Sequence, residues 1–328
     1  MTKVLLMGLG RWGVNHLRNL HAMPVELYVA ETEEARLEPA RKLGLPPERL
    51  STRYRDLARK VDCVVVVTPA PTHFIICKEL LEAGKDVFVE KPITLVSNQA
   101  RQLAELAEKR QRILQVGHIF RYDPASQWLR EAIQAGQFGR VQILRSIFCG
   151  FKRPRNDSGV MFADAIHFVD LFNYFMGQTP VRAAAATQDF LGRGMEDASL
   201  LSLEYQNGQG TAWATVETNY FLPGKIREVT VIGSQMSAVC DYNAAQYKIK
   251  TYAHRHVKEG EEIKAVEGAT HQVESPPEEP LQAELRAFLD SVRTRKMPEA
   301  DGWAGYHSVR VVEAALSAAK TGRAVHLK

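Results

Sequence analysis

The sequence predicts an α/β domain with a doubly wound parallel sheet, followed by an α+β domain with a large, mostly antiparallel open sheet. Short apolar runs alternate with helical patterns over the first third of the chain, which is typical of a parallel sheet. Strands then dominate, and helices return near the end. Because 328 residues suffice for two domains, we expect these at residues 1–120 and 121–328.

Five apolar runs in the first part have the composition of strands that are buried on both faces. They lie at residues 3–7, 25–30, 62–67, 87–89 and 113–116. Helical patterns separate them, at residues 13–20, 33–43, 72–83 and 97–110. Ser97 is the expected N-cap of the last of these helices. Strands joined by helices of this length imply right-handed crossovers, which build a doubly wound sheet.

The second part begins with a short helix at about residues 125–135 and continues mainly as strands. The expected strands span residues 141–148, 199–205, 210–217, 228–232, 238–242 and 247–252. Residues 258–280 are polar and rich in Glu and Pro, so we expect a surface excursion or a mobile loop there. Helices return at residues 281–295 and at about 303–320, and we expect this closing helix to pack back toward the N-terminal domain.

Composition disfavours several classes of protein. The formal charge of +4 comes without blocks of like charge, which argues against nucleic-acid and membrane partners. No apolar stretch approaches the roughly 18 residues that cross a bilayer. The cysteines lack CxxC pairs and histidines at zinc spacing, so we expect buried thiols, no metal site and a cytoplasmic location. These cysteines are Cys63, Cys77, Cys149 and Cys240.

A glycine motif, Gly8-Leu9-Gly10-Arg11-Trp12-Gly13, follows the first strand and opens a helix. In this context the GxGxxG pattern predicts a dinucleotide site of the Rossmann type. Gly8 allows a sharp turn, Gly10 allows the backbone to approach a pyrophosphate, and Gly13 allows close packing of the helix. The free N–H groups at the helix start then stabilise the phosphate charge.

Glu31 ends the second strand, about twenty residues beyond the glycines, where a carboxylate can bind both hydroxyls of the adenosine ribose. The same charge repels the 2′-phosphate of NADP, so we expect NAD, with NADP less favoured because only Arg36 is a nearby cation. The alternative for Glu31 is a solvated acid at a helix start, a role that Glu33 and Glu34 also fill.

Two further segments follow buried strands, at the sheet edge where such folds bind ligands. They are Thr68-Pro69-Ala70-Pro71-Thr72-His73 and Glu90-Lys91-Pro92. A cis Lys91–Pro92 bond would turn the lysine toward a nicotinamide, and the alternative is an exposed lysine at a loop start. The residues expected to contact the cofactor are Gly8, Gly10, Arg11, Trp12, Gly13, Glu31, Thr68, Pro69, His73, Glu90, Lys91 and Pro92.

The order of the motifs GxGxxG, TPxPTH, EKP, VGHxxRYxP and GVxxxxxIHxxDL resembles the glucose–fructose oxidoreductase / inositol dehydrogenase (Gfo/Idh/MocA) family over nearly the whole chain. The resemblance implies an NAD(P)-dependent oxidoreductase that acts on a secondary alcohol of a sugar, cyclitol or nucleotide sugar. It also implies that Lys91 contacts the nicotinamide ribose and the reacting hydroxyl. Two other classes stay open, an NAD-dependent glycoside hydrolase with transient internal redox and a non-catalytic dinucleotide-binding sensor.

His167 matches the family histidine that moves a proton or orients the substrate, although in an apolar helix it also suits a packed core position. Several relatives carry Asp or Asn four residues earlier, where this chain has Ala163. Asp164 is one position later and still shares an α-helical face with His167, so it is a candidate catalytic or substrate ligand, with a structural role as the alternative.

The resemblance places Arg121 and Tyr122, in the VGHxxRYxP motif, near the substrate, with a role in linking the domains as the alternative. Arg153 and Arg155 precede the His167 segment, and their guanidinium groups suit a phosphate or carboxylate, with a solvated basic turn as the alternative. The expected substrate-binding residues are Lys91, Arg121, Tyr122, Arg153, Arg155, Asp164 and His167. Residues 220–227 are similar to a segment of members that act on nucleotide sugars. A homo-oligomer, a dimer or tetramer through the open C-terminal sheet, is also implied.

Overall fold

The computed structural model describes residues 1–208 and 210–327, which form two compact units. Unit 1 contains Met1–Tyr122 and Glu279–Val309. Unit 2 contains the described residues of 123–278 and those from Arg310 onward. The predicted fold class, a parallel Rossmann sheet plus a mostly antiparallel C-terminal sheet, is confirmed.

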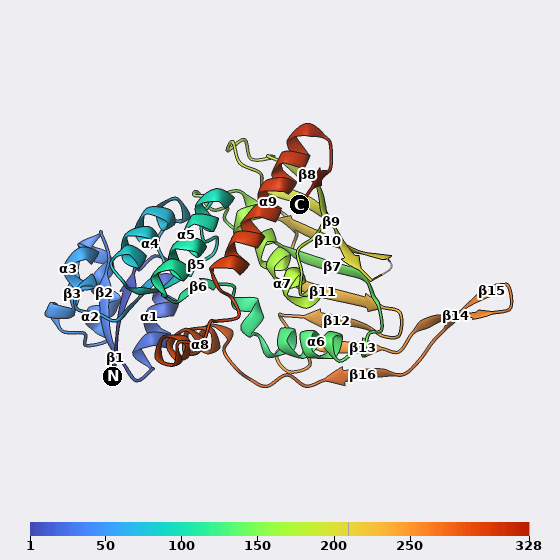
Figure 1. The fold of residues 1–328 in the computed structure, drawn as a ribbon, viewed down its shortest axis with the longest axis horizontal. Coiled ribbons are helices and arrows are strands. Elements are labelled where there is room, and N and C mark those ends of the chain that lie inside the picture. Colours follow the sequence, from blue (N-terminus) through green and yellow to red (C-terminus); the bar gives the residue numbers. More distant parts are fainter. Residues whose placement is uncertain (209, 328) are drawn as a thin grey trace. The chain divides into compact units, whose positions relative to one another are not determined.

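The sheet of unit 1 has six parallel strands in the order β3-β2-β1-β4-β5-β6 (Figure 1). The strands are β1 (Thr2–Met7), β2 (Val25–Ala30), β3 (Leu50–Ser51), β4 (Cys63–Val66), β5 (Asp86–Glu90) and β6 (Leu114–Gly117). Every residue of β4 and β5 is buried, as expected for parallel strands covered on both faces. The order reverses between β1 and β4, which creates the switch point where such sheets bind ligands.

The helices of unit 1 largely follow the sequence pattern. They are α1 (Gly13–His21), α2 (Glu38–Lys42), α3 (Tyr54–Ala58), α4 (His73–Glu82), α5 (Ser97–Arg110) and α8 (Pro280–Thr294). Two expectations were wrong in detail. The helix expected at residues 33–43 is a 3-10 turn, Glu34–Leu37, followed by the short α2. Val96, in an extended conformation, precedes α5, so Ser97 is its first helical residue and not its N-cap.

Helix α8 comes from late in the chain and supplies part of the core of unit 1. Leu285 and Phe288 are fully buried in the same apolar cluster as residues of β1, β2 and β4. The Phe288 and Phe88 rings meet edge to face, with their centres 5.8 Å apart. Just after α8, Arg295 pairs with the buried Asp86 of β5 through Nη1, at 2.6 Å. The core of unit 1 is therefore discontinuous in sequence.

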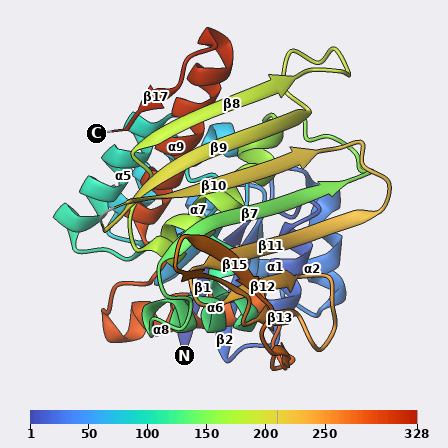
Figure 2. The same cartoon turned by 90° about the vertical axis from the view of Figure 1, so that its right-hand side faces the viewer.

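The sheet of unit 2 has nine strands in the order β16-β13-β12-β11-β7-β10-β9-β8-β17. Figure 2 shows the part from β13 to β8 side by side in this order. The strands are β7 (Val141–Gly150), β8 (Arg182–Gln188), β9 (Ala198–Asn207), β10 (Gly210–Asn219), β11 (Lys225–Gly233), β12 (Ser237–Asp241), β13 (Ile249–Tyr252), β16 (Thr270–Val273) and β17 (Val325–His326). Strands β7 and β10 pair in parallel, and the neighbours in the rest of the described sheet run antiparallel.

Helices cover one face of this sheet. They are α6 (Pro124–Gln134), a π-helical turn (Met161–Ala165) that leads into α7 (Ile166–Met176), and the last part of α9 (Gly302–Thr321). The Phe148 ring of β7 lies 5.5 Å from the Phe168 ring of α7, and the Tyr205 hydroxyl of β9 donates to Asn173 at 2.9 Å. Side chains alternate along each strand, so the other residues of β7 and β9 form an opposite, open face.

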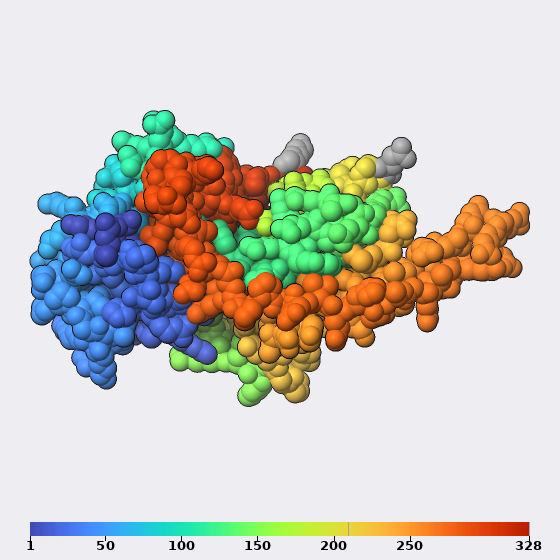
Figure 3. Space-filling view, turned by 90° about the horizontal axis from the view of Figure 1, so that it is seen from below, coloured from blue at the N-terminus to red at the C-terminus, as the bar shows by residue number. Residues whose placement is uncertain are grey.

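Part of unit 2 was not expected from the sequence. Residues 258–280 lie on the surface, as expected, but they are regular in structure, because they contribute to a hairpin of β14 (Arg255–Glu259) and β15 (Glu262–Val266) and contain β16. This hairpin projects from the rest of unit 2 (Figures 1 and 3). Strand β8 was missed because its alanine-rich sequence has low strand propensity, and pairing with β9 overrides that preference. Within residues 1–208 and 210–327, the helices are too short or too polar to span a membrane.

Candidate cofactor and substrate sites

At two glycines of the turn after β1 a side chain would clash with the backbone, and at a third it would meet free space. Gly8 has φ +94°, and a Cβ there would lie 2.6 Å from the Val67 carbonyl oxygen. A Cβ at Gly13 would lie 2.0 Å from the Gly8 carbonyl oxygen, so Gly13 allows the helix start to pack closely against the turn. A Cβ at Gly10 would meet no described atom within 4 Å. The turn thus leaves space at Gly10, where a pyrophosphate would approach the backbone.

Glu31 is buried at the end of β2 and bound to the same turn. Its carboxylate accepts the N–H of Leu9 at 2.7 Å and the N–H of Glu33 at 3.2 Å. Burial raises the pKa of Glu31, but these N–H groups and the Thr32 hydroxyl outweigh burial and hold the pKa below its ordinary value. Arg36 pairs with Glu33 at 2.8 Å. The ionised carboxylate beside the glycine turn therefore suits the ribose hydroxyls of NAD better than a 2′-phosphate.

Replacing Gly10 by alanine should separate cofactor binding from folding. The new Cβ meets no described atom, so we expect the melting temperature to change little, whereas the affinity for NADH falls because the methyl group occupies the approach of the pyrophosphate. Calorimetric titration with NADH and thermal unfolding measure the two effects. Gly13→Ala is the comparison, since its Cβ clashes with backbone and should lower the melting temperature as well. Unchanged NADH affinity in Gly10→Ala would contradict the assigned phosphate position.

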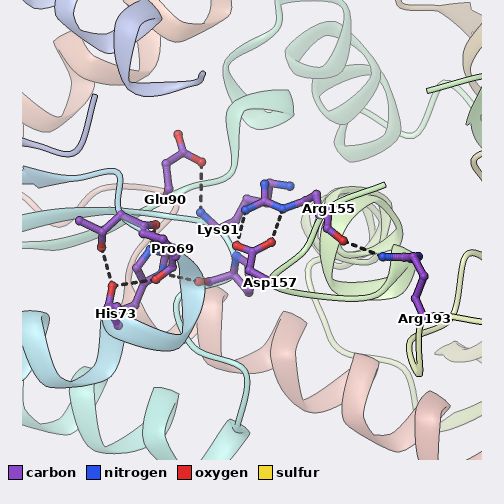
Figure 4. A network of polar contacts seen from close by, with 10 residues as sticks. Pro69, His73, Glu90, Lys91, Arg155, Asp157 and Arg193 are labelled. Atoms are coloured by element: carbon purple, nitrogen blue, oxygen red, sulfur yellow. Dashed lines mark hydrogen bonds and ion pairs between the residues drawn. The ribbon is translucent and has the colours of Figure 1, made fainter. Parts of the chain in front are cut away.

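Glu90, at the end of β5, connects the glycine turn to Lys91. Its Oε1 accepts from Trp12 Nε1 at 2.7 Å and lies 2.8 Å from His16 Nε2, and its Oε2 accepts the N–H of Lys91 at 3.2 Å (Figure 4). Burial raises the pKa of Glu90, but His16, Lys91 and Trp12 hold it below its ordinary value. A Cβ at Gly117 would lie 3.0 Å from this carboxyl group, so a side chain there would press on the Glu90 carboxylate. His16 lies three residues beyond Gly13 on the buried face of α1, where no sequence motif marks it as part of the site.

His73 links the two segments that follow β4 and β5. Its ring is buried, with Nδ1 2.8 Å from the Pro92 carbonyl oxygen and Nε2 2.8 Å from the Thr68 carbonyl oxygen. The Lys91–Pro92 peptide bond is cis. The structure therefore brings together the predicted residues Thr68, Pro69, His73, Glu90, Lys91 and Pro92 at the carboxyl ends of β4 and β5, beside the switch point.

The predicted catalytic residues of unit 2 lie where the π-helical turn joins α7. Asp164 is buried in the turn and pairs with Lys152 Nζ at 2.7 Å. His167 is half-buried, and its ring centre lies 5.9 Å from that of Phe148. Because residues 161–165 are π-helical, the α-helical rotation assumed between Asp164 and His167 does not hold over this span. Such π turns occur often at functional sites.

The four arginine and tyrosine positions expected to bind substrate differ in their surroundings. Arg121 and Tyr122 are buried in unit 1, and Arg121 Nη1 donates to the Glu299 carbonyl at 2.5 Å. In unit 2, Arg155 forms a bidentate pair with Asp157 at 2.8 and 2.7 Å (Figure 4), and Arg153 is exposed. Their substrate roles stay predictions.

Neither cysteines nor acidic groups form a metal centre in the described chain. The four cysteines are free and buried. Across residues 1–208 and 210–327, no group of three or more His, Cys, Asp or Glu side chains is arranged to hold a metal ion.

A dinucleotide-binding sheet in the strand order 3-2-1-4-5-6, together with an open-sheet second unit, defines a two-domain NAD(P)-dependent oxidoreductase. Two family models match the chain, the oxidoreductase family NAD-binding Rossmann fold over residues 2–118 and the oxidoreductase family C-terminal alpha/beta domain over residues 130–327. The chain belongs to the Gfo/Idh/MocA oxidoreductase family.

Several characterised proteins are similar over most of their length. The UDP-N-acetylglucosamine 3-dehydrogenase of Acidithiobacillus ferrooxidans is 28% identical over 320 residues, 93% of each chain, and its solved structure superposes with a TM-score of 0.83 over 98% of each chain at 25% identity. The scyllo-inositol 2-dehydrogenase (NAD(+)) of Bacillus subtilis is 28% identical over 89% of this chain and 86% of its own. GenD2 from gentamicin A biosynthesis, solved in complex with NAD, shares the fold with a TM-score of 0.83 at 24% identity, over 100% of this chain and 96% of its own.

Proposed function

We propose that this chain is an NAD-dependent dehydrogenase that oxidises a secondary alcohol of a sugar, cyclitol or nucleotide sugar, or catalyses the reverse reduction. The observation that carries the proposal is the position of Lys91. It follows β5 beside the switch point, and Glu90 binds both its backbone N–H and the residues of the glycine turn. The similarity to dehydrogenases that act on an inositol and on a nucleotide sugar supports this substrate range.

The side chains of this chain would have three tasks in such a reaction. The Lys91 ammonium stabilises negative charge on the substrate hydroxyl oxygen as the carbon–hydrogen bond breaks. His167 accepts the hydroxyl proton during oxidation and returns it during reduction. Asp164 binds or orients the substrate from the π-helical turn, where its carboxylate is held by Lys152. NAD, when bound, accepts the hydride that leaves the carbinol carbon.

Cofactor preference and redox turnover test the proposal directly. The purified protein is titrated with NADH and NADPH, its released small molecules are identified by mass spectrometry, and NADH formation is followed with sugars, cyclitols and nucleotide sugars. We expect tighter binding of NADH, because Glu31 repels a 2′-phosphate, and NADH formation with at least one of these alcohols. Release of an aglycone without net NADH would instead favour a hydrolase. Binding of neither dinucleotide would overturn the proposal.

We further propose that the chain forms a homo-oligomer through the open face of the sheet in unit 2. Ile143, Leu200 and Trp213 lie on neighbouring strands of this face, and their exposed fractions are 42%, 61% and 56%. An uncovered apolar sheet face favours association with another copy. Trp213→Glu should shift the mass measured by light scattering from oligomer toward monomer, whereas Ile263→Glu, at a more exposed site on the β14–β15 hairpin, should not. A monomeric wild-type protein would contradict this.

A further inference from the structure

Cationic side chains gather in unit 2 beside the aromatic ring that also contacts His167. Lys152 Nζ and Arg227 Cζ each lie 4.6 Å from the centre of the Phe148 ring. The His167 ring centre lies 5.9 Å from the same ring. We call the four cations of this region, Lys152, Arg193, Lys225 and Arg227, the basic cluster. Its members come from the segment after β7, the loop before β9 and strand β11, and the proposed functions above use only Lys152.

Arg193 and the neighbouring Tyr220 have buried polar atoms that lack a hydrogen-bond partner among the described residues. Arg193 Cζ lies 5.9 Å from the centre of the Tyr220 ring, and its Nη1 donates to the Arg155 carbonyl at 2.7 Å (Figure 4). Its Nε and Nη2 and the Tyr220 hydroxyl are buried, and none of them meets a hydrogen-bond partner among the described residues. Buried donors without acceptors are rare and costly in folded proteins. A ligand with anionic oxygens would supply the missing acceptors.

The loop that carries Arg193 is held in one conformation by two aspartates. Asp189 accepts the N–H groups of Arg193 and Gly194 at 3.0 and 2.7 Å. Asp197, fully buried, accepts the N–H of Phe190 at 3.1 Å. These bonds fix the backbone before, at and after Arg193. The bond from Arg193 Nη1 to the Arg155 carbonyl then holds the side chain itself, so the guanidinium is positioned in advance, as a ligand-binding group must be.

The members of the basic cluster differ in their carboxylate neighbours. Lys152 pairs with Asp164, and the Asp189 carboxylate interacts electrostatically with Arg193. Among the described residues, Lys225 and Arg227 have no ion pair with a carboxylate. The neighbouring Arg227 guanidinium holds the pKa of Lys225 below its ordinary value, which shows that the two cations repel each other. An anion bound between them would relieve this repulsion.

We propose that the basic cluster and Tyr220 bind an anionic group of the substrate, a carboxylate or a phosphate, on the part of the molecule next to the reacting carbon. The forked N–H groups of Arg193 and Arg227 suit the paired oxygens of either group. Arg227 and His167 both lie beside the Phe148 ring, so an anion on this guanidinium would sit in the same part of unit 2 as the acid–base histidine. This inference rests on the proposed dehydrogenase function and narrows its substrate class to acidic or phosphorylated sugars and cyclitols.

Small anions test this subsite without knowledge of the sugar. Inorganic phosphate, pyrophosphate and malonate are titrated calorimetrically into the full chain saturated with NADH, which blocks the phosphate-binding turn of unit 1. We expect binding that weakens about tenfold or more in Arg193→Gln and in Arg227→Gln, because each loses a charge-assisted contact. Arg145→Gln removes the same charge from the opposite face of β7 and should bind like wild type. Stronger binding of malonate indicates a carboxylate, and stronger binding of phosphate or pyrophosphate indicates a phosphate.

The outcomes separate this subsite from the dehydrogenase proposal. Absence of anion binding, or equal binding by the wild type and both arginine variants, overturns the subsite. A wild type that turns over glucose as well as glucuronate, glucose 1-phosphate and UDP-glucose also overturns it, while the dehydrogenase proposal stands. If the wild type binds anions and both arginine variants do not, the subsite stands. If in addition no alcohol gives NADH, the dehydrogenase proposal is overturned while the subsite still stands.

Discussion

Replacing Lys91 by methionine should lower kcat for alcohol oxidation by roughly 10²–10³-fold, the usual cost of removing one group that stabilises a developing oxyanion. Methionine keeps the length of the side chain and removes the ammonium. The glycine turn and Glu31 are untouched, so NADH affinity should change far less than kcat. Stopped-flow measurement of NADH formation, beside calorimetric titration with NADH, separates the two quantities.

The control for this variant is Lys78→Met, which removes the same charge from the surface of α4, where Lys78 pairs only with Glu82 among the described residues. We expect kcat and NADH affinity close to wild type. Equal loss of activity in both variants would mean that the effect comes from the net charge of the protein and not from the position of Lys91. Full activity in Lys91→Met would show that the ammonium does not take part in the reaction.

Replacing His167 by asparagine should lower kcat by roughly 10²–10⁴-fold, because the imidazole proposed to accept the hydroxyl proton during oxidation is lost. In the wild type, kcat/KM for oxidation should rise with pH as an imidazole loses its proton, since the base must be neutral to accept one. This rise should disappear in the variant. A purely structural role would lower activity without removing the pH dependence.

His256→Asn, on the exposed β14 strand of the projecting hairpin, is the matched control. It removes the same imidazole from unit 2 at a distance in sequence from α7, and we expect an unchanged pH profile. Thermal unfolding of both variants checks that the fold survives. A His167→Asn protein that keeps both its melting temperature and the rise with pH would exclude His167 as the proton acceptor.

The sequence predicted the fold best where a local pattern decides the structure. The valine run of β4 predicts a buried strand, and all four of its residues are buried. The alanines of β8 gave no such signal, because that strand depends on the ladder offered by β9. The role of α8 in unit 1 could not be predicted either, since the contact between Phe88 and Phe288 joins distant parts of the chain.

The candidate site shows the same division. The positions of Gly8, Gly10 and Glu31 could be read from spacing, because strand, turn and helix follow one another directly. The pair of Lys152 and Asp164 could not, since it depends on a π-helical turn that the apolar pattern does not distinguish from an α-helix. Arg193 and Arg227 are far apart in sequence, and only the sheet and its loops bring them to one region.

The discontinuous core of unit 1 also affects how the protein is made. During synthesis Met1–Tyr122 leave the ribosome first, while α8 follows only after the whole Asp123–Glu278 segment has been translated. At roughly 5–20 residues per second, this delay is on the order of 10 s. For that time the nascent Rossmann sheet lacks Leu285 and Phe288, so part of its apolar cluster is exposed to other chains and to chaperones. Unit 1 completes its fold only once most of the polypeptide exists.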